Sequence, residues 1–459
     1  MTHAGAETYL RLRAEAELRR VLALPPGDAV DDEAEAGELT ADHGLRRLST
    51  VAHVLAQAEA IGKKAADSVT EELATTLFAR SRIGPHDVAD LLEPRRHGRS
   101  ARAPSGPYLA IPVGVTVPGG HGSVPAEVQI FALVIAPDRA LLTTAGRQRK
   151  HPRRRRSHGW LPFDGSEAPT ATDERGTSYH VHADSSSGDG DGNWTAMLSL
   201  SPVPHPGTRW LELTMTPGSP PVRVDLASAG GGPAAGPAAA ASPAERMVDA
   251  EAHRLLHAAL TSDDDLSWYD LSEIADIVAA LGAVGALGTA RGRIGSLIAL
   301  AGRLRVPIPP TLTAVAEPAG FPAAWRSILD GRDRADGPFG IAPGAAVLPE
   351  IGGTRFVLAG VRSGAAGAVL QALAWSLPQQ PRFSFFTDAA KEWSWTARDD
   401  KGRWHVAAGG SGSSSDQHAD MELQFVPALH PDARSLEVSV AGPPGQASAT
   451  VPLDWWERA

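Results

Sequence analysis

Hydrophobic residues recur along this chain at two different spacings, and the two spacings alternate. Between residues 5 and 92 they recur every three or four positions, which predicts amphipathic helices. From about residue 106 to 227 they form short β-branched runs separated by Gly and Pro, which predicts short antiparallel strands. The helical pattern then returns over 244–331 and the β pattern over 337–456. The pattern therefore predicts that a helical segment followed by a β segment occurs twice in the chain.

Two long stretches carry the duplication at the level of individual residues. Residues 173–215 and 399–440 share an acidic pair, a basic residue, a Gly, an aromatic-His-Val triplet, a Gly/Ser/Asp loop, a His-Pro turn and a Leu-Glu strand. In the helical pattern, LSEIADIVAALGAVG at 271–285 matches LSTVAHVLAQAEAIG at 48–62 without a gap. A period this long is typical of a duplicated domain pair, since solenoid repeats span about 20–50 residues.

The predicted fold class is α+β, a tandem duplication in which each half is a small helical segment followed by an antiparallel β-sandwich. The expected units are a helical segment over 5–96, a sandwich over 106–227, a Gly/Pro/Ala linker over 228–243, a second helical segment over 244–331 and a second sandwich over 337–456. We expect three helices in each helical segment, and we expect these segments to hold the two sandwiches together as a pseudo-symmetric pair.

The motifs of the β pattern occur in a fixed order. An Ile-Pro-Val-Gly strand precedes an aliphatic strand that ends in a Pro-Asp-Arg turn, and an Asp-Glu/Asp-x-Gly strand, a Trp-containing strand and a Leu-x-Leu/Val strand follow. Over residues 107–226 and 338–453 this order resembles the immunoglobulin-like β-sandwich domains of uncharacterised actinobacterial proteins. The resemblance implies an architecture and carries no catalytic residue.

The repeated Asp-x-x-Gly motif predicts a tight turn that leads into a half-buried strand. The carboxylate can accept backbone N–H groups two residues on, and Gly176 and Gly402 tolerate a positive φ. Alternation along the strand places an aromatic residue and a Val on the core face in each copy, namely Tyr179 and Val181, and Trp404 and Val406. The same alternation predicts that His180 and His405 point away from the core.

Composition narrows the chemistry that the chain can perform. The sequence has no Cys, which excludes disulfides, thiolate metal sites and thiol nucleophiles. No apolar run approaches the roughly 18 residues of a membrane span, and the N-terminus lacks the pattern of a signal peptide, so we expect a cytoplasmic protein.

Charge is distributed unevenly along the chain. The net charge is -10, yet residues 95–158 carry twelve Lys and Arg against two acidic residues. The candidate anion-binding residues form one loop of the first half: Arg147, Arg149, Lys150, Arg153, Arg154, Arg155 and Arg156. Such a loop either is solvated, docks on the acidic remainder of the chain, or binds an external anion such as nucleic acid.

Other candidate sites fail on spacing. His180, His182, Asp184, Asp189 and Asp191 are dense enough to suggest a metal site, but the second copy has Ala407 where a second His would be needed. Gly62-Lys63-Lys64 ends like a phosphate-binding loop but lacks its first Gly and its preceding strand. We therefore predict no metal, no cofactor and no enzymatic activity.

Two hypotheses for function remain. The first is a non-enzymatic interaction or structural protein that binds a protein partner or assembles with itself. The alternative is an anion-directed binding module that uses the basic loop 147–156 on nucleic acid or on an acidic protein.

Overall fold

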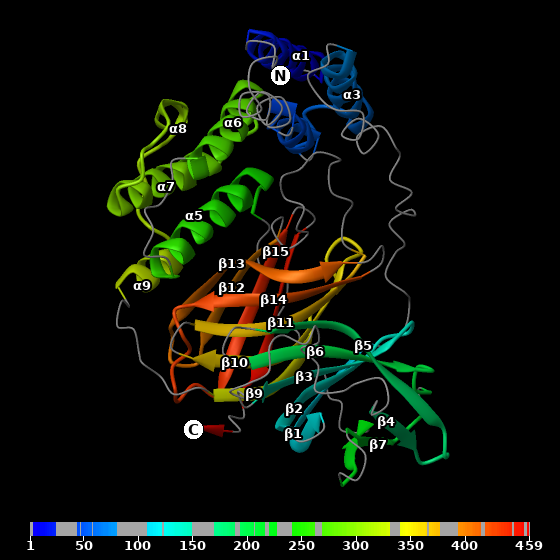
Figure 1. Cartoon of the computed structure of the whole chain (residues 1–459). Coiled ribbons are helices and arrows are strands. Elements are labelled where there is room, and N and C mark those ends of the chain that lie inside the picture. Colours follow the sequence, from blue (N-terminus) through cyan, green and yellow to red (C-terminus); the bar gives the residue numbers. More distant parts are fainter. Residues whose placement is uncertain are drawn as a thin grey trace.

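The computed structural model describes residues 3–23, 44–45, 47–56, 58–79, 108–121, 124–148, 169–188, 193–205, 207–215, 220–226, 241–261, 269–330, 340–364, 367–376, 393–414, 418–442, 445–453 and 457–458. Most of the predicted linker lies outside these residues. The described part is a mixed α+β protein with two repeated β units and a helical layer above them (Figure 1).

The first β unit is an antiparallel sheet of eight strands in the order β1-β2-β3-β6-β5-β4-β7-β8. Its strands are β1 (Leu109–His121), β2 (Val124–Ile135), β3 (Ala140–Gln148), β4 (Thr170–Asp173), β5 (Ser178–Gly188), β6 (Asn193–Ser201), β7 (Trp210–Thr214) and β8 (Val222–Asp225). Strand β6 returns beside β3, which is a Greek-key connection.

The second β unit repeats this topology strand for strand, in the order β9-β10-β11-β14-β13-β12-β15-β16, with β17 added beside β9. Its strands are β9 (Gly340–Val347), β10 (Arg355–Gly364), β11 (Gly367–Trp375), β12 (Ser394–Asp399), β13 (Trp404–Ser414), β14 (His418–Val426), β15 (Ser435–Gly442), β16 (Gly445–Pro452) and β17 (Glu457–Arg458). In the first unit β8 contacts β1, and in the second unit β16 contacts β9, so each sheet is barrel-like.

Alternating side chains fill the interior of each barrel-like sheet. In β7 the burial alternates along WLELT, so Leu211 and Leu213 face the core, as the Leu-Glu pattern predicts. In the second unit Leu436 takes the same place on β15. Trp393 and Trp395 both lie in the core of the second unit, where their rings meet Phe356 edge-on.

The two β units pack directly against each other, whereas we expected the helices to hold them together. Strand β1 contacts β9, and β2 contacts β9 and β10. The backbones approach closely at Gly360, whose φ is +94° and where an added Cβ would lie 2.8 Å from the Cβ of Phe131. Around this point an apolar cluster shared by both units includes Tyr108, Val134, Leu141, Met197, Val357, Leu373 and Trp375.

The helical layer contains five helices in the second half and three in the first half within the described residues. The helices of the first helical segment are α1 (His3–Leu22), residues 47–56 and α3 (Lys63–Ala79). Those of the second are α5 (Pro243–Thr261), α6 (Tyr269–Ala283), α7 (Ala290–Leu304), α8 (Pro310–Val315) and α9 (Ala323–Asp330). The expectation of three helices in the second segment was therefore wrong, because α8 and α9 are too short to show a helical period.

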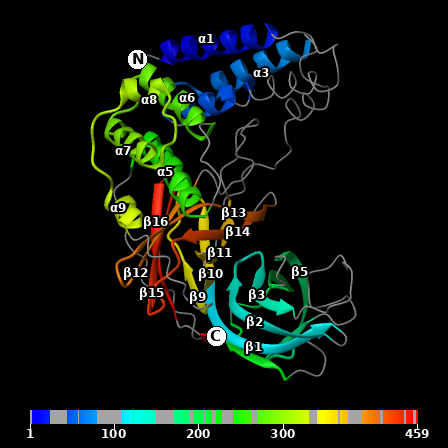
Figure 2. The ribbon, with the colours of Figure 1, turned by 60° about the vertical axis from the view of Figure 1, so that its left-hand side comes forward.

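The second helical segment covers its own β unit, whereas the described helices of the first segment do not cover theirs. Helices α5 and α9 contact β13, and Val406 and Val426 of the sheet join the helical core. Helices α1 and α3 pack on each other, and α1 contacts α6. Figures 1 and 2 both show the first helical segment far from the first β unit.

The two helical segments join by reciprocal contacts at equivalent positions. Two similar C-terminal caps, Ala60 N–H to Leu55 O at 2.9 Å and Ala286 N–H to Leu281 O at 2.8 Å, place Val54 in correspondence with Ala280. Val54 packs into the core of the second segment, while Ala280 packs into the core of the first.

One carboxylate reinforces the junction between the helical segments. Asp276 on α6 accepts Arg13 of α1 at 2.9 Å and the Nε of Arg47 at 2.7 Å. Both guanidinium groups come from the first segment, so a single acidic side chain ties two elements of that segment to α6.

Candidate functional site

The repeated Asp-x-x-Gly motif forms the predicted turn in both β units. Asp173 Oδ1 accepts the N–H groups of Arg175 at 2.9 Å and Thr177 at 2.8 Å. Asp399 Oδ1 accepts those of Lys401 at 3.0 Å and Arg403 at 2.9 Å. The two turn glycines have φ values of +77° and +82°, so the turn prediction is confirmed.

The strand that follows the turn corrects the prediction for His405. In the first unit Tyr179 is buried and its hydroxyl donates to Asp173 Oδ2 at 2.8 Å, while His180 is exposed. In the second unit His405 itself is buried, with Nε2 3.6 Å from Asp399 Oδ2. Tyr179 pairs with Ala171 in the first unit, and His405 pairs with Ala397 in the second. Tyr179 and His405 are therefore the equivalent residues. The shared aromatic-His-Val triplet is thus displaced by one residue, which exchanges the two faces of the strand.

His405 and Asp399 form a structural contact with no room for a substrate. The Nδ1 of His405 lies 2.7 Å from the carbonyl oxygen of Pro427, to which it donates. Burial acts to raise the pKa of Asp399, but contact with His405 and the N–H of Arg403 outweigh burial and lower that pKa. Both side chains are fully enclosed, so the pair fixes the end of β13 on the turn.

In the first unit the hydroxyl of Tyr179 contacts the turn carboxylate in place of a His ring. Burial, together with the neighbouring Asp173 carboxylate, raises the pKa of Tyr179 to about 12. The hydroxyl therefore keeps its proton at ordinary pH and remains a donor to the carboxylate.

The outward faces of the two sheets differ where the copies are otherwise alike. In the second unit Val406 and Val426 pair across β13 and β14, and both are buried beneath the helical layer. In the first unit the corresponding pair across β5 and β6 is His180 and Ser201, and both are exposed. We call the exposed outward residues of β4, β5 and β6 the open face: Thr170, Thr172, Ser178, His180, His182 and Ser201.

Trp404 also belongs to the covered side of this comparison. It is half-buried against the helical core, contrary to its expected place in the core of the sheet. Its counterpart on the open face is Ser178. Within the described residues a helix covers the second sheet and not the first, and the apolar outward residues of the second copy against the polar ones of the first account for this difference.

The metal candidates do not come together within the described residues. His180 and His182 share the open face, but Asp184 pairs with Arg139 at 3.4 Å. Asp189 and Asp191 lie outside the described residues. Among the residues that the structure describes, no group of three or more His, Asp or Glu side chains is placed to hold a metal ion.

The candidate anion-binding loop falls almost wholly outside the described residues. Arg149, Lys150, Arg153, Arg154, Arg155 and Arg156 belong to this undescribed part of the chain. Arg147 lies on β3 opposite Asn193 of β6. Its equivalent in the second unit is Trp375, a fully buried residue of the interface between the β units.

A polar cluster between α5, α7 and α9 is absent from the sequence predictions; His253 is buried, and the Asp249 side chain is 22% exposed. Asp249 contacts the Nε of Arg293 on α7 at 2.9 Å, and His253 meets Trp325 of α9 edge-on at 6.3 Å. Burial raises the pKa of Asp249 to about 7 even though Arg293 opposes it, and burial lowers the pKa of His253 to about 4. The spacing of four residues among apolar helix positions is the signal that could have found the cluster.

The fold and these contacts define a duplicated α+β protein. No family model matches the chain, and no curated protein matches it. A solved structure of a conserved domain protein from Bacillus anthracis aligns with 72% of this chain and 77% of its own, at 10% identity and a TM-score of 0.17. No helix within the described residues is both long and apolar enough to span a membrane.

Proposed function

We propose that this chain is a non-enzymatic interaction protein in which the second half is a closed scaffold and the first β unit offers its open face to a protein partner. The observation that carries the proposal is the pair His180 and Ser201, exposed where the other copy has Val406 and Val426 under a helix. A polar sheet face can remain in water without a cover, whereas an apolar one is stabilised by a cover.

The use of the acidic and His side chains in the two turns supports the proposal that the chain is not an enzyme. Asp173, Asp399 and His405 each contact backbone or side-chain groups of their own turn. We further propose that the β units are related to immunoglobulin-like sandwiches, which the antiparallel pairing and the Greek-key return of β6 to β3 support.

A comparative pull-down with the full chain tests the open face. The variant His180→Glu with Ser201→Arg changes the open face, and Glu437→Arg changes an exposed strand position of the second unit as a control. We expect a protein that the wild type and the control both capture to be lost from the double variant. Capture that survives the double variant contradicts the proposal.

Anion binding by the basic loop is the second candidate. It is favoured by the concentration of twelve basic residues between 95 and 158 and by the replacement of Arg147 by Trp375 in the other copy. We expect affinity for duplex DNA to fall by orders of magnitude between about 50 and 200 mM salt and to be lost when Arg153 to Arg156 become Gln. Absence of binding at about 50 mM salt contradicts it.

A further inference from the structure

Helix α1 carries large apolar side chains on its outer face. Among the residues that the structure describes, two large hydrophobic side chains are exposed, and both belong to α1: Leu12 at 59% and Leu22 at 37%. Together with Glu15 and Arg19 they are spaced three, four and three residues apart, so the four side chains follow one stripe of the helix. The side chains that pack into the core of the first helical segment lie on the opposite face. We call Leu12, Glu15, Arg19 and Leu22 the α1 stripe.

The α1 stripe points away from the rest of the described chain. Glu15 and Arg19 form an ion pair at 3.0 Å within the helix, and their side chains are 58% and 79% exposed. Figures 1 and 2 both show α1 at the end of the molecule opposite the two β units. An exposed ion pair of this kind contributes little to stability, so its two charges are available to other partners at small cost.

The sequence of α1 matches that of α5 without a gap. The identical pairs are Ala6 with Ala244, Glu7 with Glu245, Ala14 with Ala252, Leu18 with Leu256 and Leu22 with Leu260. This match places Glu15 at the position of His253 and Arg19 at the position of His257. The α1 stripe therefore corresponds to the stripe of α5 that carries these two histidines.

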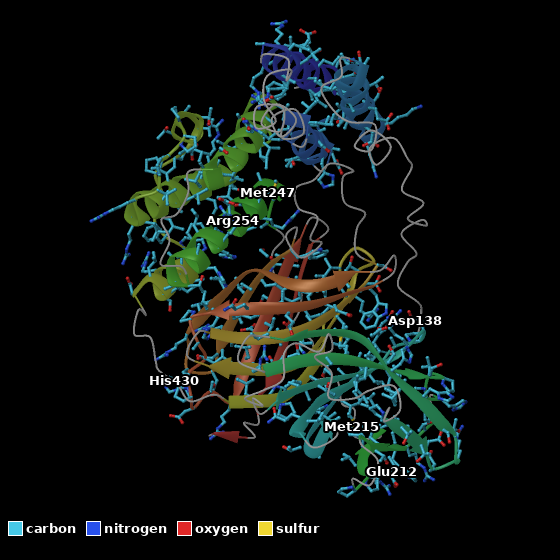
Figure 3. All side chains as sticks on the ribbon, in the orientation of Figure 1. Asp138, Glu212, Met215, Met247, Arg254 and His430 are labelled. Carbon is cyan, nitrogen blue, oxygen red and sulfur yellow. The ribbon has the colours of Figure 1, made fainter. Side chains whose placement is uncertain are left out.

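In the second half the corresponding stripe is a docking surface. His253 is buried and meets Trp325 of α9 edge-on, and α5 contacts β13 and β14 of its own β unit. Figure 3 shows α5 above that unit, with Met247 and Arg254 marking its course. The second copy thus uses this side of the helix for packing, whereas α1 exposes the same side within the described residues.

The α1 stripe is complementary to itself under a two-fold rotation. Leu12 and Leu22 each lie five residues from position 17, and Glu15 and Arg19 each lie two residues from it. A second α1 laid antiparallel across this position brings each leucine against the other leucine and each charge against the opposite charge. Both contacts then occur twice, as in an isologous interface. The pairing removes apolar side chains from water and forms two ion pairs between the copies.

We propose that the α1 stripe is the contact surface for a second copy of this chain, which joins through an antiparallel pair of α1 helices. A contact between two helices of 20 residues falls in the small class of interfaces, below about 1,200 Å² in total, so the dimer is reversible and depends on concentration. In the dilute monomer the stripe is solvated and does not take part in the packing of α1. The inference concerns α1 alone and stands apart from the open face of the first β unit.

Charge reversal tests the pairing in the full chain by analytical ultracentrifugation. From micromolar to submillimolar concentration the wild type should pass from the mass of one chain toward that of two. Glu15→Arg and Arg19→Glu each place like charges against each other, so each should raise the dissociation constant about tenfold or more. An equimolar mixture of the two variants should dimerise again, because each stripe then faces the opposite charge. The control Arg223→Glu, at a position 58% exposed on β8, should dimerise like the wild type.

The register of the two helices has its own test, because the chain has no Cys. In the proposed dimer Leu12 faces the second copy's residue 22, whereas the two copies of Leu12 are ten residues apart along the helix, about 15 Å. A mixture of Leu12→Cys and Leu22→Cys chains should therefore form an intermolecular disulfide under mild oxidation much faster than either variant alone.

Three outcomes overturn the proposal. The first is a wild-type chain that stays monomeric at submillimolar concentration. The second is a dimer that both charge variants retain at the affinity of the wild type. The third is cross-linking of Leu12→Cys alone as fast as that of the mixture, which excludes the antiparallel register.

Discussion

The contact between Gly360 and Phe131 predicts that a single added methyl group weakens the interface of the two β units. At Gly360 an Ala Cβ would lie 2.8 Å from the Cβ and 2.9 Å from the Cγ of Phe131. Both neighbours belong to the rigid base of the side chain, so rotation of the ring leaves the overlap in place. The backbone at Gly360, with φ of +94°, is itself unfavourable for any residue with a Cβ.

The chain supplies a matched control for the backbone strain at a positive φ. Gly353 has φ of +93°, and an added Cβ there meets nothing within 4 Å. Gly353→Ala should therefore report backbone strain alone, about 1–3 kcal/mol. Gly360→Ala should carry that strain and a further overpacking cost of about 1–3 kcal/mol, for a total of about 2–6 kcal/mol.

Urea unfolding measures both variants against the wild type. Tryptophan fluorescence is a suitable signal, because Trp375 lies in the interface and meets Tyr108 edge-on at 5.3 Å. We expect the midpoint for Gly360→Ala to fall clearly below that for Gly353→Ala at a similar slope. Equal midpoints for the two variants would refute the close approach of β2 and β10.

Three further predictions concern the turn and the helical junction. Asp399→Asn should lower the free energy of unfolding by about 1–3 kcal/mol, since the amide accepts poorly from Lys401 and Arg403, and an unchanged urea midpoint contradicts this. The pKa values of Asp173 and Asp399 are lowered from the ordinary value of 3.8. These carboxylates therefore stabilise the folded β units above that pH, and the stabilisation is lost as pH falls below it. Circular dichroism should show the β units intact at pH 5 and destabilised below about pH 3.8. Arg13→Ala and Arg47→Ala should each speed hydrogen exchange in α1 by removing a contact to Asp276, whereas Arg19→Ala, whose partner Glu15 is exposed, should leave it unchanged.

The sequence was sufficient for the duplication and for the turn chemistry, and insufficient for the alignment of the two copies. Shared letters favoured pairing His180 with His405, yet the turn fixes Tyr179 and His405 at the same distance from their glycines. A strand changes face with every residue, so a displacement of one exchanges inside and outside. Only the contacts of the two carboxylates decide which alignment is right.

In the helices the sequence alignment of the two copies was displaced by three residues. This displacement leaves the pattern of buried positions almost unchanged, so hydrophobic spacing cannot reveal it. The gap-free match pairs Leu55 with Val278, whereas the C-terminal caps pair Leu55 with Leu281, three residues further on. All three positions are buried, because a shift of three residues nearly restores the same helix face. The cap residues Glu59 and Gly285, both with positive φ, carry the information that hydrophobic spacing lacks.

The contacts between the units were beyond reach because they join residues far apart in the chain. The sequence around Phe131 gives no indication that Gly360 is its neighbour, and the sequence around Gly360 gives none for Phe131. Once the two copies are correctly aligned, the sequence indicates the open face, because His180 and Ser201 occupy the positions of Val406 and Val426 in the second copy. The basic loop, Arg149 to Arg156, lies outside the described residues, and its role stays a prediction.

The exchange of Val54 and Ala280 between the two helical cores has a consequence for synthesis on the ribosome. The first helical segment is completed by α6, which begins at Tyr269, about 190 residues after α3 ends at Ala79. Translation at about 5–20 residues per second leaves that segment without its final packing partner for about 10–40 seconds. During this interval the side of the first segment that will meet α6 lacks its cover, so a chaperone can bind it.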